Sequence, residues 1–149
     1  MKIEKARPED LESILCLQYL AYQSEAELLN DDSIPPLRQT LEELKQEYEN
    51  GTILKIVNEQ RKIIGSVRGY HKENTLFIGK LMVHPDYRGQ GLGTRLLMFI
   101  ENLFPKCRYE LFTSDKSLKN LNLYRRMGYA EFKKAKINDQ LSLIFLEKQ

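Results

Sequence analysis

Three closely spaced glycines in the second half of the chain stand between an apolar segment and an amphipathic one. They are Gly89, Gly91 and Gly93, and Arg88 precedes them. Apolar residues recur at helical spacing after Gly91, which predicts that the last glycines lie at the start of a helix. A helix start has unpaired N–H groups and a partial positive charge, and both attract anions. Glycine lets this backbone adopt positive φ and lets a diphosphate approach closely, while arginine can add a charged hydrogen bond, so the loop predicts binding of a phosphorylated cofactor.

Two other glycine patterns that bind phosphates do not fit this loop. In the phosphate-binding loop of NTPases a lysine and then a serine or threonine follow the last glycine, whereas Thr94 and Arg95 follow Gly93 here. The dinucleotide fold separates its second and third glycines by two residues, whereas Gly89, Gly91 and Gly93 alternate with single residues. The spacing therefore argues against both classes.

A third pattern fits, because Arg-x-x-Gly-x-Gly at residues 88–93 follows a Val-His-Pro run at residues 83–85. Together with the segment Leu-Tyr-Arg-Arg-Met-Gly-Tyr at residues 123–129, this loop resembles the acetyl-CoA signature of the GNAT superfamily of acyl-CoA-dependent N-acetyltransferases. The resemblance extends along almost the whole chain, beginning with a strand expected at residues 1–6. It implies one GNAT domain over residues 1–149.

The resemblance implies an enzyme that moves an acetyl group from acetyl-CoA to a primary amine of a small molecule or a peptide. The neutral amine attacks the thioester directly and expels the coenzyme A thiolate through a tetrahedral intermediate. The same motifs are also compatible with a non-catalytic module that senses acyl-CoA.

The apolar patterns and the resemblance predict a mixed α/β fold, with about seven strands in a mostly antiparallel sheet and about four flanking helices in the order βααβββαβαββ. Strands are expected at residues 1–6, 52–58, 63–71, 75–83, 109–113, 131–135 and 141–146. Helices are expected at residues 9–27, 40–50, 91–104 and 117–127. Thr40 and Glu43 have the spacing of a capping box at the start of the second helix.

By resemblance, the parallel strands 75–83 and 109–113 splay apart and acyl-CoA lies between them. Buried backbone groups need partners, and the amides of the pantetheine arm supply them. One exposed N–H of the fourth strand could also polarise the thioester carbonyl. The expected cofactor-binding residues are Leu81, Met82, Val83, Arg88, Gly89, Gln90, Gly91, Leu92, Gly93, Thr94, Asn120 and Tyr124.

Tyr124 aligns with the tyrosine that protonates the departing sulfur in many GNAT enzymes, and it is the expected catalytic acid. The amine must also lose a proton, and in well-known histone acetyltransferases of the superfamily a glutamate of the fourth strand serves as the base. Here Phe77 occupies that position, so it is expected in the core or in the wall of the acceptor pocket. By location, the remaining candidate bases are Glu25, Glu73 and Asp115, and a water relay is an alternative.

GNAT sequences often carry asparagine seven residues before this tyrosine, and here that residue is Ser117. Ser117 is expected to cap the start of a helix, while Asn120 could turn towards the cofactor. Thr113 and Ser114 end the preceding strand and could line the same cleft.

The acceptor pocket is expected between the first two helices and the loops after the third and fifth strands. Four carboxylates near the first helix could attract a cationic amine, or they could belong to a solvated loop. They are Glu25, Glu27, Asp31 and Asp32.

Composition excludes several other classes. The chain has 149 residues, of which 42% are hydrophobic and 30% charged, and its net charge of +2 is too small to predict binding to nucleic acid or to a membrane surface. The N-terminus lacks an apolar signal core and no segment reaches the roughly 20 apolar residues of a membrane span, so a cytoplasmic protein is expected.

Cysteines and histidines suggest no further chemistry. Cys16 and Cys107 are expected to be reduced thiols in or near the core, and no metal site is expected. His84 belongs to the Val-His-Pro run, which indicates a role in a turn. A homodimer could form if residues 141–146 were an edge strand, although a covered edge has the same apolar pattern.

Overall fold

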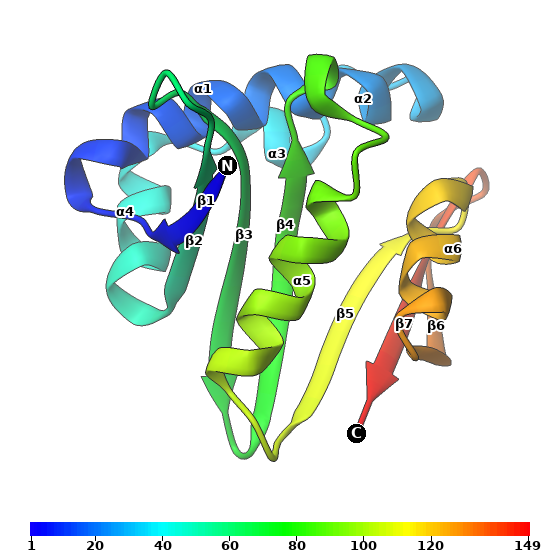
Figure 1. Ribbon diagram of the computed structural model, residues 1–149. Coiled ribbons are helices and arrows are strands. Elements are labelled where there is room, and N and C mark those ends of the chain that lie inside the picture. Colours follow the sequence, from blue (N-terminus) through cyan, green and yellow to red (C-terminus); the bar gives the residue numbers. More distant parts are fainter.

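The computed structural model describes residues 1–149, and its seven strands form one sheet in the order β1-β2-β3-β4-β5-β7-β6 (Figure 1). The strands are β1 (Lys2–Lys5), β2 (Thr52–Val57), β3 (Ile63–Lys72), β4 (Thr75–Val83), β5 (Arg108–Ser114), β6 (Ala130–Asn138) and β7 (Leu141–Lys148). The α-helices are α1 (Leu11–Ala21), α2 (Gln23–Leu29), α3 (Pro35–Arg38), α4 (Leu41–Asn50), α5 (Leu92–Leu103) and α6 (Leu118–Arg126). Two 3₁₀ turns, η1 (Pro8–Asp10) and η2 (Pro85–Tyr87), complete the order.

Helices cover both faces of the sheet, and an apolar core lies under each set. Leu96 and Ile100 of α5 and Leu121 of α6 join the first core, on the face that α5 crosses in Figure 1. Ile14 of α1 and Leu44 of α4 join the second core, on the opposite face. The mixed α/β fold predicted from the sequence is confirmed.

Strands β4 and β5 are the parallel pair, and they separate soon after they meet. They pair at three positions, from Thr75 with Arg108 to Phe77 with Glu110. All other neighbouring strands are antiparallel. The predicted splay is confirmed, and the part of β4 after Phe77 has no strand partner on its β5 side.

Helix α4 begins at the predicted capping box. The Thr40 hydroxyl accepts a hydrogen bond from the Glu43 N–H at 3.1 Å, and the Glu43 carboxylate accepts one from the Thr40 N–H at 2.9 Å. Two N–H groups that the helix cannot pair internally are thereby satisfied.

The N-terminal helices differ from the prediction. The helix expected at residues 9–27 is interrupted at Tyr22, whose backbone leaves the helical conformation with ψ 1°, so α1 and α2 are separate helices. The loop that contains Pro35 and Pro36 also forms the short helix α3, since proline is tolerated in a first helical turn. The two extra helices lie in a segment that was expected to hold one helix and a loop.

Strand β7 lies inside the sheet, between β5 and β6. The prediction that two chains could pair through residues 141–146 at a sheet edge is therefore wrong. The alternative, in which this strand is covered by a neighbouring strand, is confirmed. The edge strand is β6, and its exposed lysines Lys133, Lys134 and Lys136 discourage pairing with another strand. Every helix is too short or too polar to traverse a bilayer.

Replacing Leu96 by alanine is expected to destabilise the fold by about 2–5 kcal/mol, because its side chain is fully buried between α5 and the sheet and the change leaves a cavity. Urea unfolding measures the loss. Met98→Ala, at a residue of α5 that is 49% exposed, is the matched control and should change stability by less than about 0.5 kcal/mol. Equal losses for the two variants would contradict the described packing of α5.

Candidate active site

The glycine loop presents a row of free amides at the start of α5. Gly89 and Gly91 have φ of 79° and 77°, a conformation that side chains with a Cβ rarely adopt. No backbone N–H from Gly89 to Thr94 donates a hydrogen bond to the protein, and the first amide that does is that of Arg95, which donates to the Gly91 carbonyl at 3.1 Å. An anion placed against these amides would satisfy several donors at once.

The other loop residues hold this arrangement in place. Leu92 is buried in the core under α5, a Cβ at Gly93 would lie 3.8 Å from the Leu123 side chain of α6, and Gln90 is exposed. The Arg88 guanidinium donates to the Ala21 carbonyl at 2.8 Å and to the Ser24 hydroxyl at 3.2 Å. Arg88 thus ties the loop to the junction of α1 and α2.

The end of β4 brings its free edge next to this loop. Leu81, Met82 and Val83 lie beyond the last pairing of β4 with β5, and Met82 and Val83 pair only with β3. Met82 packs in the core of α1 and α4, while Leu81 and Val83 pack against the core of α5. Their side chains are structural, and their backbone borders the opening between the strands.

A bulge interrupts β4 just before these residues. From the Arg68–Gly79 pair to the Ser66–Met82 pair, β3 advances by two residues and β4 by three. The extra residue is placed at Lys80, whose φ of 51° is unusual for a residue with a Cβ. The bulge turns the Lys80 side chain to the face on which Gly79 and Arg68 lie.

Tyr124 of α6 is buried, and its hydroxyl makes no hydrogen bond within the protein. Burial raises the pKa of Tyr124, and the nearby Tyr22 and Glu25 raise it further. Burial also raises the pKa of Tyr22 to about 12. Tyr124 therefore keeps its proton at neutral pH.

Residues at the start of α6 link it to its surroundings. Ser117 occupies the predicted N-cap position of α6, but its hydroxyl donates to a Glu25 carboxylate oxygen at 2.6 Å and makes no capping hydrogen bond. The Asn120 amide donates to the Thr113 hydroxyl at 3.3 Å, which places Asn120 against the end of β5. The Ser117–Glu25 bond joins α6 to α2 near Tyr124.

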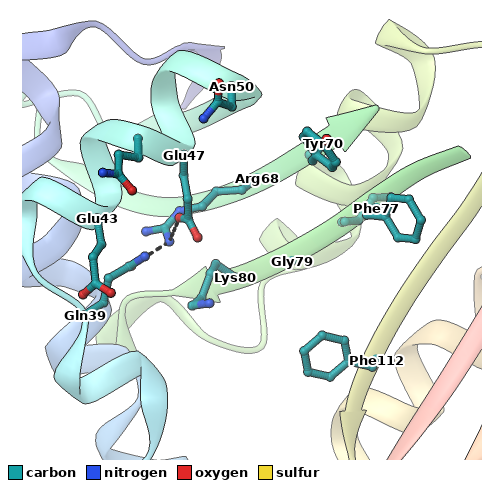
Figure 2. A pocket seen from close by; sticks show the side chains of 13 residues that line it. Gln39, Glu43, Glu47, Asn50, Arg68, Tyr70, Phe77, Gly79, Lys80 and Phe112 are labelled. Atoms are coloured by element: carbon teal, nitrogen blue, oxygen red, sulfur yellow. Dashed lines mark hydrogen bonds and ion pairs between the residues drawn. The ribbon is translucent and has the colours of Figure 1, made fainter. Parts of the chain in front are cut away.

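An open cavity of about 560 Å³ lies on the sheet face opposite α5 (Figure 2). Its walls are Gln39, the exposed side of α4, the faces of β3 and β4, and Phe112 of β5. The acceptor pocket was expected between the first two helices and the loops after the third and fifth strands; this cavity is lined by α4 but not by α1, and strand faces rather than loops form its floor. The cavity adjoins the opening between β4 and β5, since Ile78, Gly79 and Phe112 border both.

Phe77 lines this cavity and is 39% exposed, so it does not lie in the core. None of the predicted bases lines the cavity. Glu73 lies in the turn between β3 and β4, away from the opening, and Asp115 accepts a hydrogen bond from the Ser142 N–H at 3.3 Å. Glu25 is bonded to Ser117, near Tyr124.

The acidic cluster of α2 and the following loop also lies outside the cavity. Asp31 accepts hydrogen bonds from both the N–H and the hydroxyl of Ser33, at 2.9 and 2.7 Å. These bonds lower the pKa of Asp31. Its carboxylate stabilises a turn, as in the solvated-loop interpretation.

Arg68 of β3 is the buried charge beside the cavity that the sequence prediction missed. Its guanidinium donates to Glu47 at 2.8 Å, to Gln39 at 3.0 Å and to the fully buried Gln18. Burial lowers the pKa of Arg68, and Glu47 opposes that shift. Lys80 was missed as well, although the odd spacing between the apolar pairs Leu76–Ile78 and Leu81–Val83 is a signal for a bulge.

His84 and the two cysteines have structural surroundings that can be compared with the prediction. The His84 ring accepts a hydrogen bond from the Asp86 N–H at 3.1 Å at the start of η2, which confirms its role in a turn. Both thiols are free, and Cys107 is buried as predicted, whereas Cys16 is exposed.

The family model described as the acetyltransferase (GNAT) family matches residues 16–129. The chain belongs to this family, whose members use acetyl-CoA as cosubstrate.

Individual relatives agree in fold. The Escherichia coli ribosomal-protein-S18-alanine N-acetyltransferase has a TM-score of 0.80 at 15% identity, over 98% of this chain and 91% of that one. The yncA protein of Salmonella typhimurium, solved with its cofactor acetyl-CoA, has a TM-score of 0.76 at 18% identity, over 100% and 93% of the two chains. The UPF0157 protein YqkA of Bacillus subtilis is 28% identical over 131 residues, which are 87% of this chain and 37% of that protein. The chain thus spans little more than a third of this curated relative.

Arg68→Met is expected to lower the free energy of unfolding by about 1–3 kcal/mol, because buried Gln18 loses its charged donor. The control is Lys80→Met, which removes a cation without a hydrogen-bonded partner and should change stability by less than about 0.5 kcal/mol. Urea unfolding of both variants measures the difference. A larger loss for Lys80→Met than for Arg68→Met would show that the wrong cation has been given the structural role.

Proposed function

We propose that this chain transfers the acetyl group of acetyl-CoA to a primary amine of a small molecule or a peptide. The observation that carries the proposal is the position of the free amides from Gly89 to Thr94 beside the unpaired edge of β4. One site favours a diphosphate and the other favours a ligand with amides of its own. Coenzyme A contains both groups, in that order along its length.

The residues present fit such a ligand. Backbone amides from Gly89 to Thr94 would hold the diphosphate, with Arg88 fixing the loop against α1. The β4 edge at Leu81, Met82 and Val83 would pair with the pantetheine arm, and Asn120 borders the cleft on the β5 side. Bound acetyl-CoA supplies an acetyl group already activated as a thioester.

Tyr124 would protonate the departing sulfur, since its phenol is protonated at neutral pH and no protein group competes for its hydroxyl. The acceptor must be neutral to attack, and an alkyl ammonium has a pKa near ~10.4. With no carboxylate on β4, its proton would leave through water in the open cavity. One N–H of the β4 edge would polarise the thioester carbonyl.

Gly91→Val is expected to weaken binding of acetyl-CoA at least about tenfold, because valine strains the left-handed backbone that aims the amides. Isothermal calorimetry with the folded variant measures the change. Met98→Ala, on the outer side of α5, should bind normally. Unchanged affinity in Gly91→Val would remove the glycine loop from the cofactor site.

Tyr124→Phe is expected to lower kcat about 10²–10⁴-fold, with little change in acetyl-CoA affinity, because the acid is lost and the ring is kept. Thiol release, followed across a range of pH with a panel of primary amines, measures the effect. Tyr129→Phe is the matched control, since its ring lies 6.1 Å away in the same core and its hydroxyl is bonded to Glu101. It should lose stability but keep kcat.

An unchanged rate of Tyr124→Phe across pH would overturn its role as the acid. Binding of acetyl-CoA without turnover of any amine would instead support the acyl-CoA sensor.

A further inference from the structure

The cavity on the α4 face has one charged side chain that makes no hydrogen bond or ion pair with the rest of the protein. Four charged side chains line it, and three have internal partners. Glu43 accepts from the Thr40 N–H at 2.9 Å, and Glu47 pairs with Arg68 at 2.8 Å. Lys80 takes part in no ion pair and no hydrogen bond. Lys80 is therefore the charged group of the cavity that is left for a ligand to bind.

The irregular backbone of β4 directs the Lys80 side chain into the cavity. As the extra residue of the β4 bulge, Lys80 leaves the face of the α5 core and enters the cavity, at a φ of 51° that is unfavourable for a side chain with a Cβ. Partial burial and the nearby Arg68 lower the pKa of Lys80, while Glu47 raises it. An anion beside Lys80 would relieve this desolvated cation.

Lys80 also lies close to the point where acetyl transfer is proposed. Strands β4 and β5 stop pairing after Phe77 and Glu110, and Lys80 is three residues further along β4. An anionic group of the acceptor that pairs with Lys80 would therefore lie only a few bonds from the amine nitrogen that attacks the thioester. An α-amino acid meets this requirement, since its carboxylate and its amine share one carbon atom.

The rest of the cavity is apolar and aromatic. Figure 2 shows Glu47, Arg68 and Lys80 towards one end and the rings of Tyr70, Phe77 and Phe112 towards the other. These rings are 46%, 39% and 55% exposed, and those of Tyr70 and Phe77 lie 6.5 Å apart. Exposed rings that line a cavity favour an apolar or aromatic ligand group.

We propose that the acceptor is a free α-amino acid with an apolar or aromatic side chain, whose carboxylate pairs with Lys80 and whose side chain lies against Tyr70, Phe77 and Phe112. This inference rests on the proposed acetyl transfer and names its acceptor. The neutral amine nitrogen forms a bond to the thioester carbonyl carbon and the carbon–sulfur bond breaks. Tyr124 gives its proton to the sulfur, and the extra proton of the nitrogen passes to water, which re-protonates Tyr124.

Matched acceptors with and without a carboxylate test the proposal. L-phenylalanine is compared with 2-phenylethylamine, and L-leucine with 3-methylbutylamine, by kcat/KM for thiol release from acetyl-CoA. The protein should prefer each amino acid over its amine at least about tenfold, the range of a charge-assisted hydrogen bond. Lys80→Met should lower kcat/KM for the amino acids about 10–100-fold and for the amines less than about threefold.

Two further variants serve as controls. Lys80→Arg keeps the charge and should retain part of the preference for amino acids. Lys72→Met, an exposed lysine at the far end of β3, should behave like the unmodified protein. Equal losses for amino acids and amines in Lys80→Met would overturn the proposal, and so would a preference for the amines in the unmodified protein.

Binding measured without turnover separates this proposal from the proposed function. Calorimetry with coenzyme A present should detect L-phenylalanine, with about tenfold weaker binding in Lys80→Met. Binding of that kind without thiol release from any acceptor would refute acetyl transfer and leave the amino-acid site standing. Thiol release from amines alone, with no binding of amino acids, would refute the amino-acid site and leave acetyl transfer standing.

Discussion

The site depends on the early separation of two parallel strands. β4 and β5 pair at three positions and then diverge, so the edge of β4 next to the glycine loop lacks a partner in β5. Interior backbone groups without partners are costly, and a ligand with amides of its own satisfies them. The glycine loop, the free edge and Tyr124 thus surround one opening, and the cavity beside α4 adjoins it from the other face of the sheet.

The bulge in β4 resolves a conflict between the core and the cavity. In a regular strand, Lys80 would point towards the apolar core under α5, where an unpaired ammonium is very unfavourable. The extra residue restores the apolar alternation at Leu81 and Val83 and moves the cation to the open face. One irregularity therefore keeps the core apolar and gives the cavity its unpaired charge.

The likeness to solved GNAT structures indicates which side chains this fold does not require. TM-scores of 0.76–0.80 at 15–18% identity show that this fold persists when most side chains differ. Tyr70, Phe77 and Phe112 are exposed and do not belong to either core. Such positions can change without loss of the fold, so under the proposed function they are free to determine the choice of acceptor.

The sequence by itself determined the succession of strands along the chain, the start of α5 at the glycines and the capping box of α4. Apolar periodicity and helix ends depend on neighbours only a few residues away. Only the tertiary structure decided that β7 lies inside the sheet, that Ser117 bonds to Glu25, and that Arg68 gathers Gln18, Gln39 and Glu47. Those contacts join residues far apart in the chain, and no local preference encodes which distant partner a polar side chain will meet.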